Sequence, residues 1–174
     1  MKLHRLIPVL TFFENKLVKT TNFNIKNRIY LGDILNAVRL FNDKKAEELM
    51  ICDIGATINK AEPNFELIKK ISSVSRMPIC YSGGIFNMKQ VMKITSFGVE
   101  KISVSTHALN NISFLKNISH KIGRQSLSVT INIKKIDDQY SIFSHNGKKK
   151  YEGLLLDFIY QIKDIVGEIV INDI

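Results

Sequence analysis

Cysteine is scarce in this sequence. Its 174 residues include two cysteines, Cys52 and Cys80, each inside a short apolar run and without CxxC spacing. This pattern is typical of buried thiols in a reducing compartment, and it disfavours a disulfide. His4, His120 and His145 share no metal-ligand spacing either. We therefore expect no metal site and no cofactor.

Long apolar runs and targeting signals are missing as well. His4 and Arg5 interrupt the apolar character of the N-terminus, so no signal peptide is expected there. No run elsewhere is long enough to cross a membrane. The sequence thus predicts a cytoplasmic protein that has no membrane partner.

The composition favours one globular domain over residues 1–174. An apolar content of 45% is enough for a sizeable core, and nothing is biased toward disorder. The formal net charge is +9, but Lys and Arg are spread along the chain and form no basic block with interleaved aromatics. Nucleic acid is therefore not the expected partner, and we interpret the charge as solubility plus an anionic ligand.

Strand-like apolar runs alternate with helical patterns along the chain. The expected strands are 6–10, 49–54, 77–82, 102–106, 127–133 and 168–172, and the helices between them are 34–41, 63–71, 88–94, 111–122 and 154–165. Such alternation predicts an α/β fold with a parallel sheet. An incomplete β/α barrel fits, since a full one has eight units and about 250 residues, and a doubly wound open sheet fits too.

A β-hairpin is expected after the fifth strand. Asp137-Asp138 and Asn146-Gly147 flank a strand-like segment, 140–144, and such pairs are typical of tight turns. We place this insertion at about residues 134–150 within the single domain.

The third strand ends in two adjacent glycines, Gly83 and Gly84, directly before a helical pattern. Glycine adopts positive φ easily and lets a ligand approach the backbone, so a phosphate can lie on exposed N–H groups there. A plain strand-to-helix turn is the alternative interpretation.

Seven short segments, in chain order, resemble one known family: 5–8, 17–23, 32–33, 52–54, 82–85, 101–106 and 167–169. On these residues the sequence resembles the cyclase subunit family of imidazole glycerol phosphate synthase, a histidine-biosynthesis β/α barrel that takes ammonia from a partner glutaminase. The resemblance covers the whole chain. It implies a (β/α)8 TIM barrel of which about six strands are present, with strands seven and eight missing.

The resemblance also implies a substrate site at the carboxyl ends of the strands. The expected phosphate-binding residues are Gly83, Gly84, Ser105 and Thr106, whose N–H groups and hydroxyls suit an anion. Lys19 in the first loop and Asp53 match positions that act on the substrate, although a solvated loop lysine is the alternative for Lys19. His107 is either a ligand contact or a surface histidine.

Two departures from the family concern its acid–base chemistry. The resemblance places the family's two catalytic aspartates at Thr11 and Asn132, and neither of these side chains exchanges a proton near neutral pH. The family's lyase and cyclase mechanism is therefore not expected to operate unchanged.

Four charged residues match the family's ammonia gate at the amino ends of the strands. They are Arg5, Glu48, Lys101 and Glu168. Two cations and two carboxylates in a ring can satisfy one another, whereas single charges at strand starts would be solvated.

Three functions stay open. The first is a paralogue that uses ammonia from a glutaminase to aminate a phosphorylated or nucleotide-linked sugar, of the surface-polysaccharide amidotransferase type. The second is the cyclase of histidine biosynthesis itself, acting on a ribonucleotide. The third is a non-catalytic partner that docks a glutaminase, or an inactive gene remnant.

Overall fold

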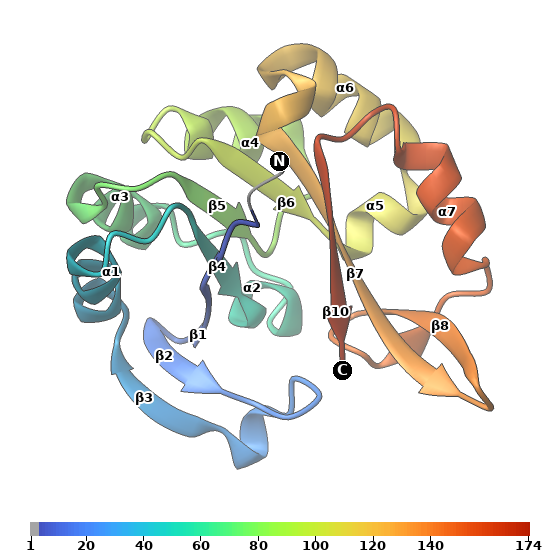
Figure 1. Cartoon of the computed structure of the whole chain (residues 1–174), viewed down its shortest axis with the longest axis horizontal. Helices are drawn as coiled ribbons and strands as arrows, with labels where there is room; N and C mark the ends of the chain where they lie inside the picture. Colours follow the sequence, from blue (N-terminus) through green and yellow to red (C-terminus); the bar gives the residue numbers. More distant parts are fainter. Residues whose placement is uncertain (1–3) are drawn as a thin grey trace.

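Six parallel strands form the frame of the molecule (Figure 1). The computed structural model describes residues 4–174. The parallel strands are β1 (Val9–Phe13), β4 (Leu49–Asp53), β5 (Ile79–Ser82), β6 (Lys101–Val104), β7 (Leu127–Ile136) and β10 (Glu168–Asp173). Each pairs in parallel with the next one along the chain. The predicted α/β fold with a parallel sheet is thus confirmed.

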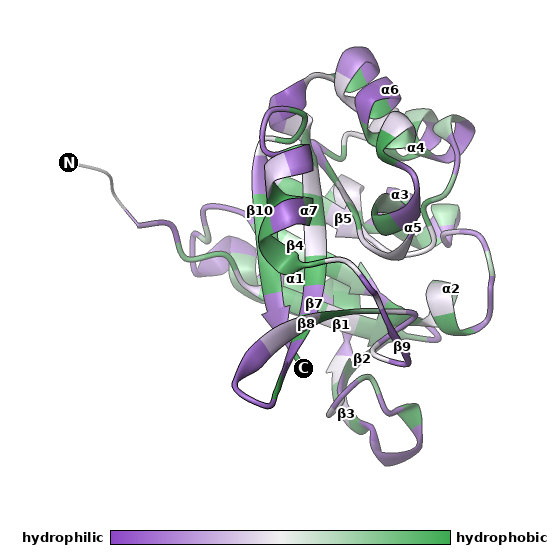
Figure 2. Cartoon of the chain, turned by 90° about the vertical axis from the view of Figure 1, so that its right-hand side faces the viewer, coloured by the Kyte–Doolittle hydropathy of each residue, from purple (hydrophilic) through white to green (hydrophobic). Residues whose placement is uncertain are grey.

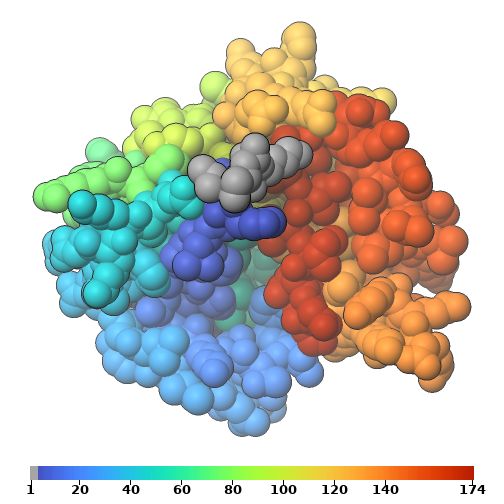
Figure 3. Space-filling view, in the orientation of Figure 1, coloured from blue at the N-terminus to red at the C-terminus, as the bar shows by residue number. Residues whose placement is uncertain are grey.

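The strand order distinguishes between the two expected architectures. The parallel strands are neighbours in chain order, without the reversal that defines a doubly wound sheet, so that alternative is wrong. Within residues 4–174 no strand pairing joins β10 to β1, and the sheet is open rather than a closed barrel. Figure 3 shows the corresponding depression between the blue N-terminal segments and the red C-terminal strand.

Five longer helices cover the outer face of the sheet (Figure 1). They are α1 (Ile34–Asp43), α3 (Phe65–Val74), α4 (Met88–Thr95), α6 (Ile112–Ile122) and α7 (Leu155–Ile162). The shorter elements are α2 (Ile54–Ile58), α5 (Thr106–Asn110) and the 3₁₀ turns η1 (Ile25–Asn27) and η2 (Arg124–Ser126). In this described part of the chain, no helix is both long enough and apolar enough to span a bilayer.

Local sequence signals explain where the helices begin and end. Asp33 caps α1, because its side chain accepts a hydrogen bond from the backbone N–H of Asn36. Asn87 and Gln90 form a capping box at the start of α4. Gly123 ends α6 with a φ of 88°.

Two antiparallel additions extend the parallel sheet. After β1, strands β2 (Lys16–Lys19) and β3 (Ile29–Asp33) occupy a region for which the sequence predicted a loop. After β7, strands β8 (Gln139–Ser144) and β9 (Lys149–Lys150) pair in turn. The expected first strand, 6–10, was also misplaced: β1 begins after Pro8, which lacks a backbone N–H, and Leu6 is exposed.

Each parallel strand has one apolar and one mixed face. Side chains such as Ile51, Tyr81 and Ile102 join the main hydrophobic core with the buried stripes of the helices. On the opposite face, Ser103 and Ser128 line the interior of the curved sheet. Figure 2 shows the strands largely green, while α6 alternates green and purple segments as an amphipathic helix does.

The packing predicts that the same Ile→Ala substitution costs more stability in the core than at the surface. Ile102 in central β6 is fully buried, whereas Ile171 in β10 is 46% exposed. We expect Ile102→Ala to lower the free energy of unfolding by about 3 kcal/mol, because it leaves a cavity, and Ile171→Ala to lower it by less than about 1 kcal/mol. Urea denaturation measures both, and equal losses would contradict this packing.

Candidate functional site

A cavity of about 610 Å³ lies at the carboxyl ends of the parallel strands. Its lining includes most of the residues that the sequence singled out for substrate: Thr11, Asp53, Gly83, Gly84, Ser105, Thr106 and Asn132. They come from segments up to 121 positions apart (11 to 132), which the parallel strands bring to one edge. Ligand sites of α/β sheets occur at this edge.

The two glycines are required by their surroundings. Gly83 and Gly84 have φ values of 128° and 65°, which disfavour other residues. A Cβ atom on Gly83 would lie 2.3 Å from the backbone oxygen of Asp53, and one on Gly84 would lie 2.7 Å from the Cβ of Ala56. The turn therefore packs closely against the end of β4 and the start of α2.

Asp53 is anchored at the cavity wall. One carboxylate oxygen accepts a hydrogen bond from the backbone N–H of Ala56 at 3.0 Å, and the other accepts one from the hydroxyl of Tyr81 at 3.4 Å. Burial raises the pKa of Asp53, and burial together with the neighbouring Asp53 raises the pKa of Tyr81. The sequence did not single out Tyr81, because it reads as an ordinary core residue.

The two positions at which the family resemblance implies an acid–base pair hold neutral groups. Thr11 and Asn132 both line the cavity. The amide of Asn132 donates to the Ser105 hydroxyl at 3.4 Å, and its oxygen accepts from the amide of Asn172 at 2.8 Å. This network orients Asn132 as a hydrogen-bonding group, and it supplies no proton donor or acceptor that ionises near neutral pH.

In the interior of the curved sheet, hydroxyl and thiol side chains of the parallel strands pair, and two of them, Ser103 and Thr130, line the cavity. Ser103 and Thr130 are 2.8 Å apart, and the Cys80 sulfur lies 3.6 Å from the Ser128 hydroxyl. Burial raises the pKa of both Cys52 and Cys80 to about 12, so these thiols stay uncharged at neutral pH. The interior is consequently polar but carries no charge at this depth.

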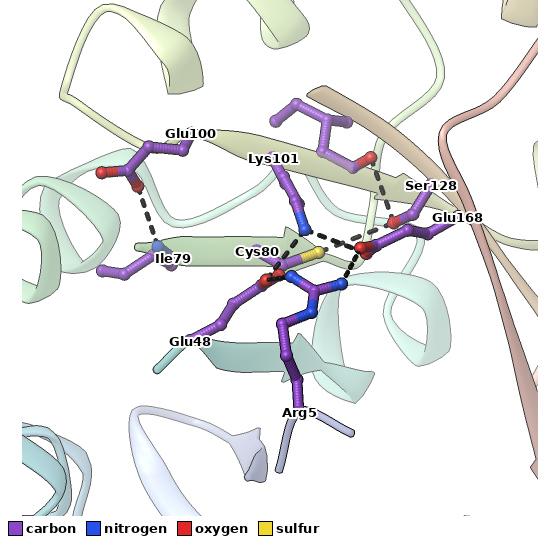
Figure 4. A network of polar contacts seen from close by, with 9 residues as sticks. Arg5, Glu48, Ile79, Cys80, Glu100, Lys101, Ser128 and Glu168 are labelled. Atoms are coloured by element: carbon purple, nitrogen blue, oxygen red, sulfur yellow. Dashed lines mark hydrogen bonds and ion pairs between the residues drawn. The ribbon is translucent and has the colours of Figure 1, made fainter. Parts of the chain in front are cut away.

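The amino ends of the strands carry a closed ring of four charges, shown in Figure 4. We call this set the ion ring: Arg5, Glu48, Lys101 and Glu168. Arg5 contacts Glu48 at 2.9 Å and also bonds to Glu168, while Lys101 contacts Glu48 at 2.8 Å and Glu168 at 3.0 Å. Each cation thus bridges both carboxylates.

The ring changes the ionisation of its members. Burial opposes the charged form of Glu168, but hydrogen bonds from Arg5 and Lys101 outweigh it and lower the pKa of Glu168. Burial likewise opposes the charge of Lys101, yet hydrogen bonds to both carboxylates raise its pKa. The contribution of the ring to stability is therefore full at neutral pH. It falls when acid protonates Glu168 below the ordinary carboxyl range, and when alkali deprotonates Lys101 above the ordinary lysine range.

Other residues lie differently from the expectation. Lys19 is exposed at the end of β2 beside a separate hollow of about 210 Å³, and it does not line the main cavity. His107 does line the cavity, as does His145 from the turn after β8. Sequence reasoning missed His145, because only the pairing of β8 with β7 brings that turn to the mouth. Over residues 4–174 no cluster of metal-ligating side chains occurs.

Fold and site together define a class: α/β proteins that hold a small ligand at the carboxyl ends of parallel strands, here with an ion ring at the opposite ends. The chain belongs to the histidine biosynthesis protein family, whose model matches residues 5–174.

Three relatives illustrate the similarity. A protein of Leptospira borgpetersenii named "Putative imidazole glycerol phosphate synthase subunit HisF" is 43% identical over 98% of this chain and 67% of its own length. Another from Pseudomonas aeruginosa, "Putative imidazole glycerol phosphate synthase subunit hisF2", is 40% identical over 98% and 68%. "Imidazole glycerol phosphate synthase subunit HisF" of Chlorobium phaeovibrioides is 31% identical over 97% and 66%. The chain thus spans about two thirds of the length of these relatives.

The close packing of Gly83 gives a specific prediction. Gly83→Ala should lower the free energy of unfolding by about 3 kcal/mol or more, because its Cβ would overlap the β4 backbone. Gly123→Ala is the matched control: it also has positive φ, but it has open space around it, and a loss of about 1 kcal/mol is expected. Thermal melts of the two variants test this, and a harmless Gly83→Ala would contradict the geometry.

The ion ring gives a second prediction. The Glu48 side chain is 5% exposed and contacts both cations, so Glu48→Ala should cost about 2–3 kcal/mol of stability by leaving Lys101 without its closest partner. The exposed neighbour Glu47 provides the control, with a change within about 0.5 kcal/mol for Glu47→Ala. Denaturant titration at neutral pH compares the two, and indistinguishable midpoints would refute the ring.

Proposed function

We propose that this chain is part of an ammonia-using enzyme subunit that works with a glutaminase. Ammonia would enter at the ion ring, pass through the polar interior, and react with a phosphorylated or nucleotide-linked sugar held in the cavity. One observation carries the proposal: ring and cavity lie at opposite ends of the same parallel strands, and the hydroxyls of Ser103 and Thr130 line the cavity on the side toward the ring.

The depth of the cavity supports this path. Met50 and Val170 belong to its lining, and each is two residues from a carboxylate of the ion ring, Glu48 or Glu168. The separation between ring and cavity is therefore about one layer of side chains along each strand. Small neutral ammonia can cross such a layer more easily than a charged metabolite, because no charge need be desolvated.

The cradle of Gly83, Gly84, Ser105 and Thr106 supports a phosphate group on the ligand. Backbone N–H groups freed by the glycine turn and two hydroxyls provide donors without a fixed charge. Because neither glycine carries a side chain, this part of the cavity wall is backbone. A phosphate can therefore approach the backbone itself.

Amination of a sugar is favoured over the cyclase reaction of histidine biosynthesis. Thr11 and Asn132 stand where the family keeps its acid–base pair, and the hydrogen bonds of Asn132 commit it to a neutral role. The higher identity to relatives whose names carry the qualifier "Putative" agrees with a diverged paralogue. Binding of a glutaminase without catalysis is the remaining alternative.

The open side of the sheet is where further β/α units would pair. The relatives are about half as long again as this chain, and the flank between β10 and β1 is unpaired over the described residues. We propose that two further units, strands seven and eight of a (β/α)8 barrel, close this flank and complete the ligand site in the functional protein.

Two assays separate these functions. In the first assay, a version of the protein as long as the relatives should co-purify with a glutaminase subunit of its own organism and raise glutaminase turnover. In the second assay, the same protein should fail to restore growth of a histidine auxotroph that lacks the cyclase. The named HisF of Chlorobium phaeovibrioides serves as the positive control for growth. Restored growth would favour the cyclase function. Stimulation of the glutaminase without any aminated product would favour docking alone. Lack of a complex would contradict both ammonia transfer and docking.

A further inference from the structure

Two histidines stand beside a cradle that lacks charge of its own. His107 follows Thr106 in α5, and His145 lies in the turn after β8; both line the cavity. The backbone N–H of His145 donates to the Thr106 hydroxyl at 3.1 Å, which holds this turn against the cradle. Thr106 and His145, 39 positions apart, thus lie together at one side of the proposed phosphate site.

We propose that His107 and His145 bind the phosphate of the ligand, His107 through the Nδ1–H of its neutral ring and His145 through the Nε2–H of its protonated ring, and that His145 makes anion affinity at this site depend on pH near neutrality. The inference rests on the proposed phosphate site and adds to it the source of positive charge. A hydrogen bond from an imidazolium to an anion is about twice as strong as one between neutral groups.

Each imidazole has one nitrogen engaged and one available. The His107 ring packs edge-on against Phe114, with ring centroids 4.9 Å apart, and its Nε2 lies 3.4 Å from the Asn111 amide nitrogen. The Nδ1 of His145 lies 3.0 Å from the Ser144 hydroxyl. Within residues 4–174 no hydrogen bond engages Nδ1 of His107 or Nε2 of His145, so each can donate to an anion.

The contacts of the two rings are otherwise neutral. The His107 ring meets Phe114 of α6 and Asn111, the residue that caps α6, and the His145 ring meets Ser144 of β8. The charged residue Lys148 lies in the same turn as His145, and its backbone N–H donates to the backbone oxygen of His145.

Three further titratable groups line the cavity: Cys52, Asp53 and Lys60. Cys52 is uncharged, because burial raises its pKa to about 12. Asp53 is held by Ala56 and Tyr81, and burial raises its pKa, so it is the one group besides the histidines that would also favour an anion in acid. The experiment must therefore separate the contribution of Asp53 from that of the two histidines.

Sulfate is the suitable probe, because it remains a dianion throughout the range in which histidine titrates. Isothermal titration at constant ionic strength, at about pH 6 and about pH 8, should give a Kd that is about tenfold higher at the higher pH. The double variant His107→Asn/His145→Asn should bind sulfate at both pH values no more tightly than the unsubstituted protein binds it at about pH 8. His120→Asn, in an exposed position on α6, should keep the full pH dependence, and thermal melts check that all three proteins fold.

The outcomes separate this inference from the function on which it rests. Equal sulfate affinity at both pH values would overturn the role of the histidines but not the phosphate site. A pH dependence of sulfate affinity that persists in the double variant would do the same, because it would then belong to Asp53. If neither sulfate nor inorganic phosphate binds at either pH, or if Thr106→Val leaves their binding unchanged, the phosphate site itself is refuted and the inference with it.

Discussion

The ion ring is the interaction on which the rest of the structure depends. Arg5 precedes the first parallel strand and Glu168 begins the last, 163 positions later, and their ion pair joins the two ends of an open sheet. Lys101 and Glu48 tie the strands between them into the same ring. Strand pairing alone leaves a gap between β10 and β1 over the described residues, so these charges set the spacing of the strands at their amino ends. Because each charge faces two of opposite sign, the burial of Glu48 costs far less than it would for an isolated carboxylate.

That arrangement gives the two ends of the strands different chemistry. One end is charged and self-neutralised, the interior is polar and uncharged, and the other end is a cavity walled by glycines and hydroxyls. Thr11 and Asn132, where the family resemblance implies an acid–base pair, line that cavity. The proposed function uses these parts to hold a phosphorylated ligand and to receive a small neutral nucleophile from the opposite end, and two neutral side chains are poorly suited to the proton transfers of a cyclase.

Much of this architecture was predictable from the sequence, for identifiable reasons. The parallel strands are short apolar runs bounded by clear turn and cap residues such as Asp33, Asn87 and Gly123, so their positions and the α/β class followed from local pattern. The region of β2 and β3 was not predicted, because the exposed residues of β3 show no alternation that would mark a strand. The open sheet was expected from the number of strand-like runs and from the family resemblance, which implied two missing strands, and not from strand pairing, because pairing between distant segments leaves no local signal.

The candidate site was likewise predicted only in part. Gly83 was found from the glycine pair at a strand end, and Ser105 and Asn132 were found from the family resemblance; the parallel strands bring all three to one edge. Lys19 and His145 were not placed correctly, since each sits on an antiparallel addition whose direction depends on tertiary pairing. The central claim, that a protein partner binds one end and an anionic ligand the other, is tested most directly by hydrogen exchange of the barrel-length protein. A glutaminase should protect amides near residues 5–9, 48–50 and 168–170 from exchange, and phosphate should protect those near 83–86 and 105–107. Protection of the same end of the strands by both would contradict the central claim.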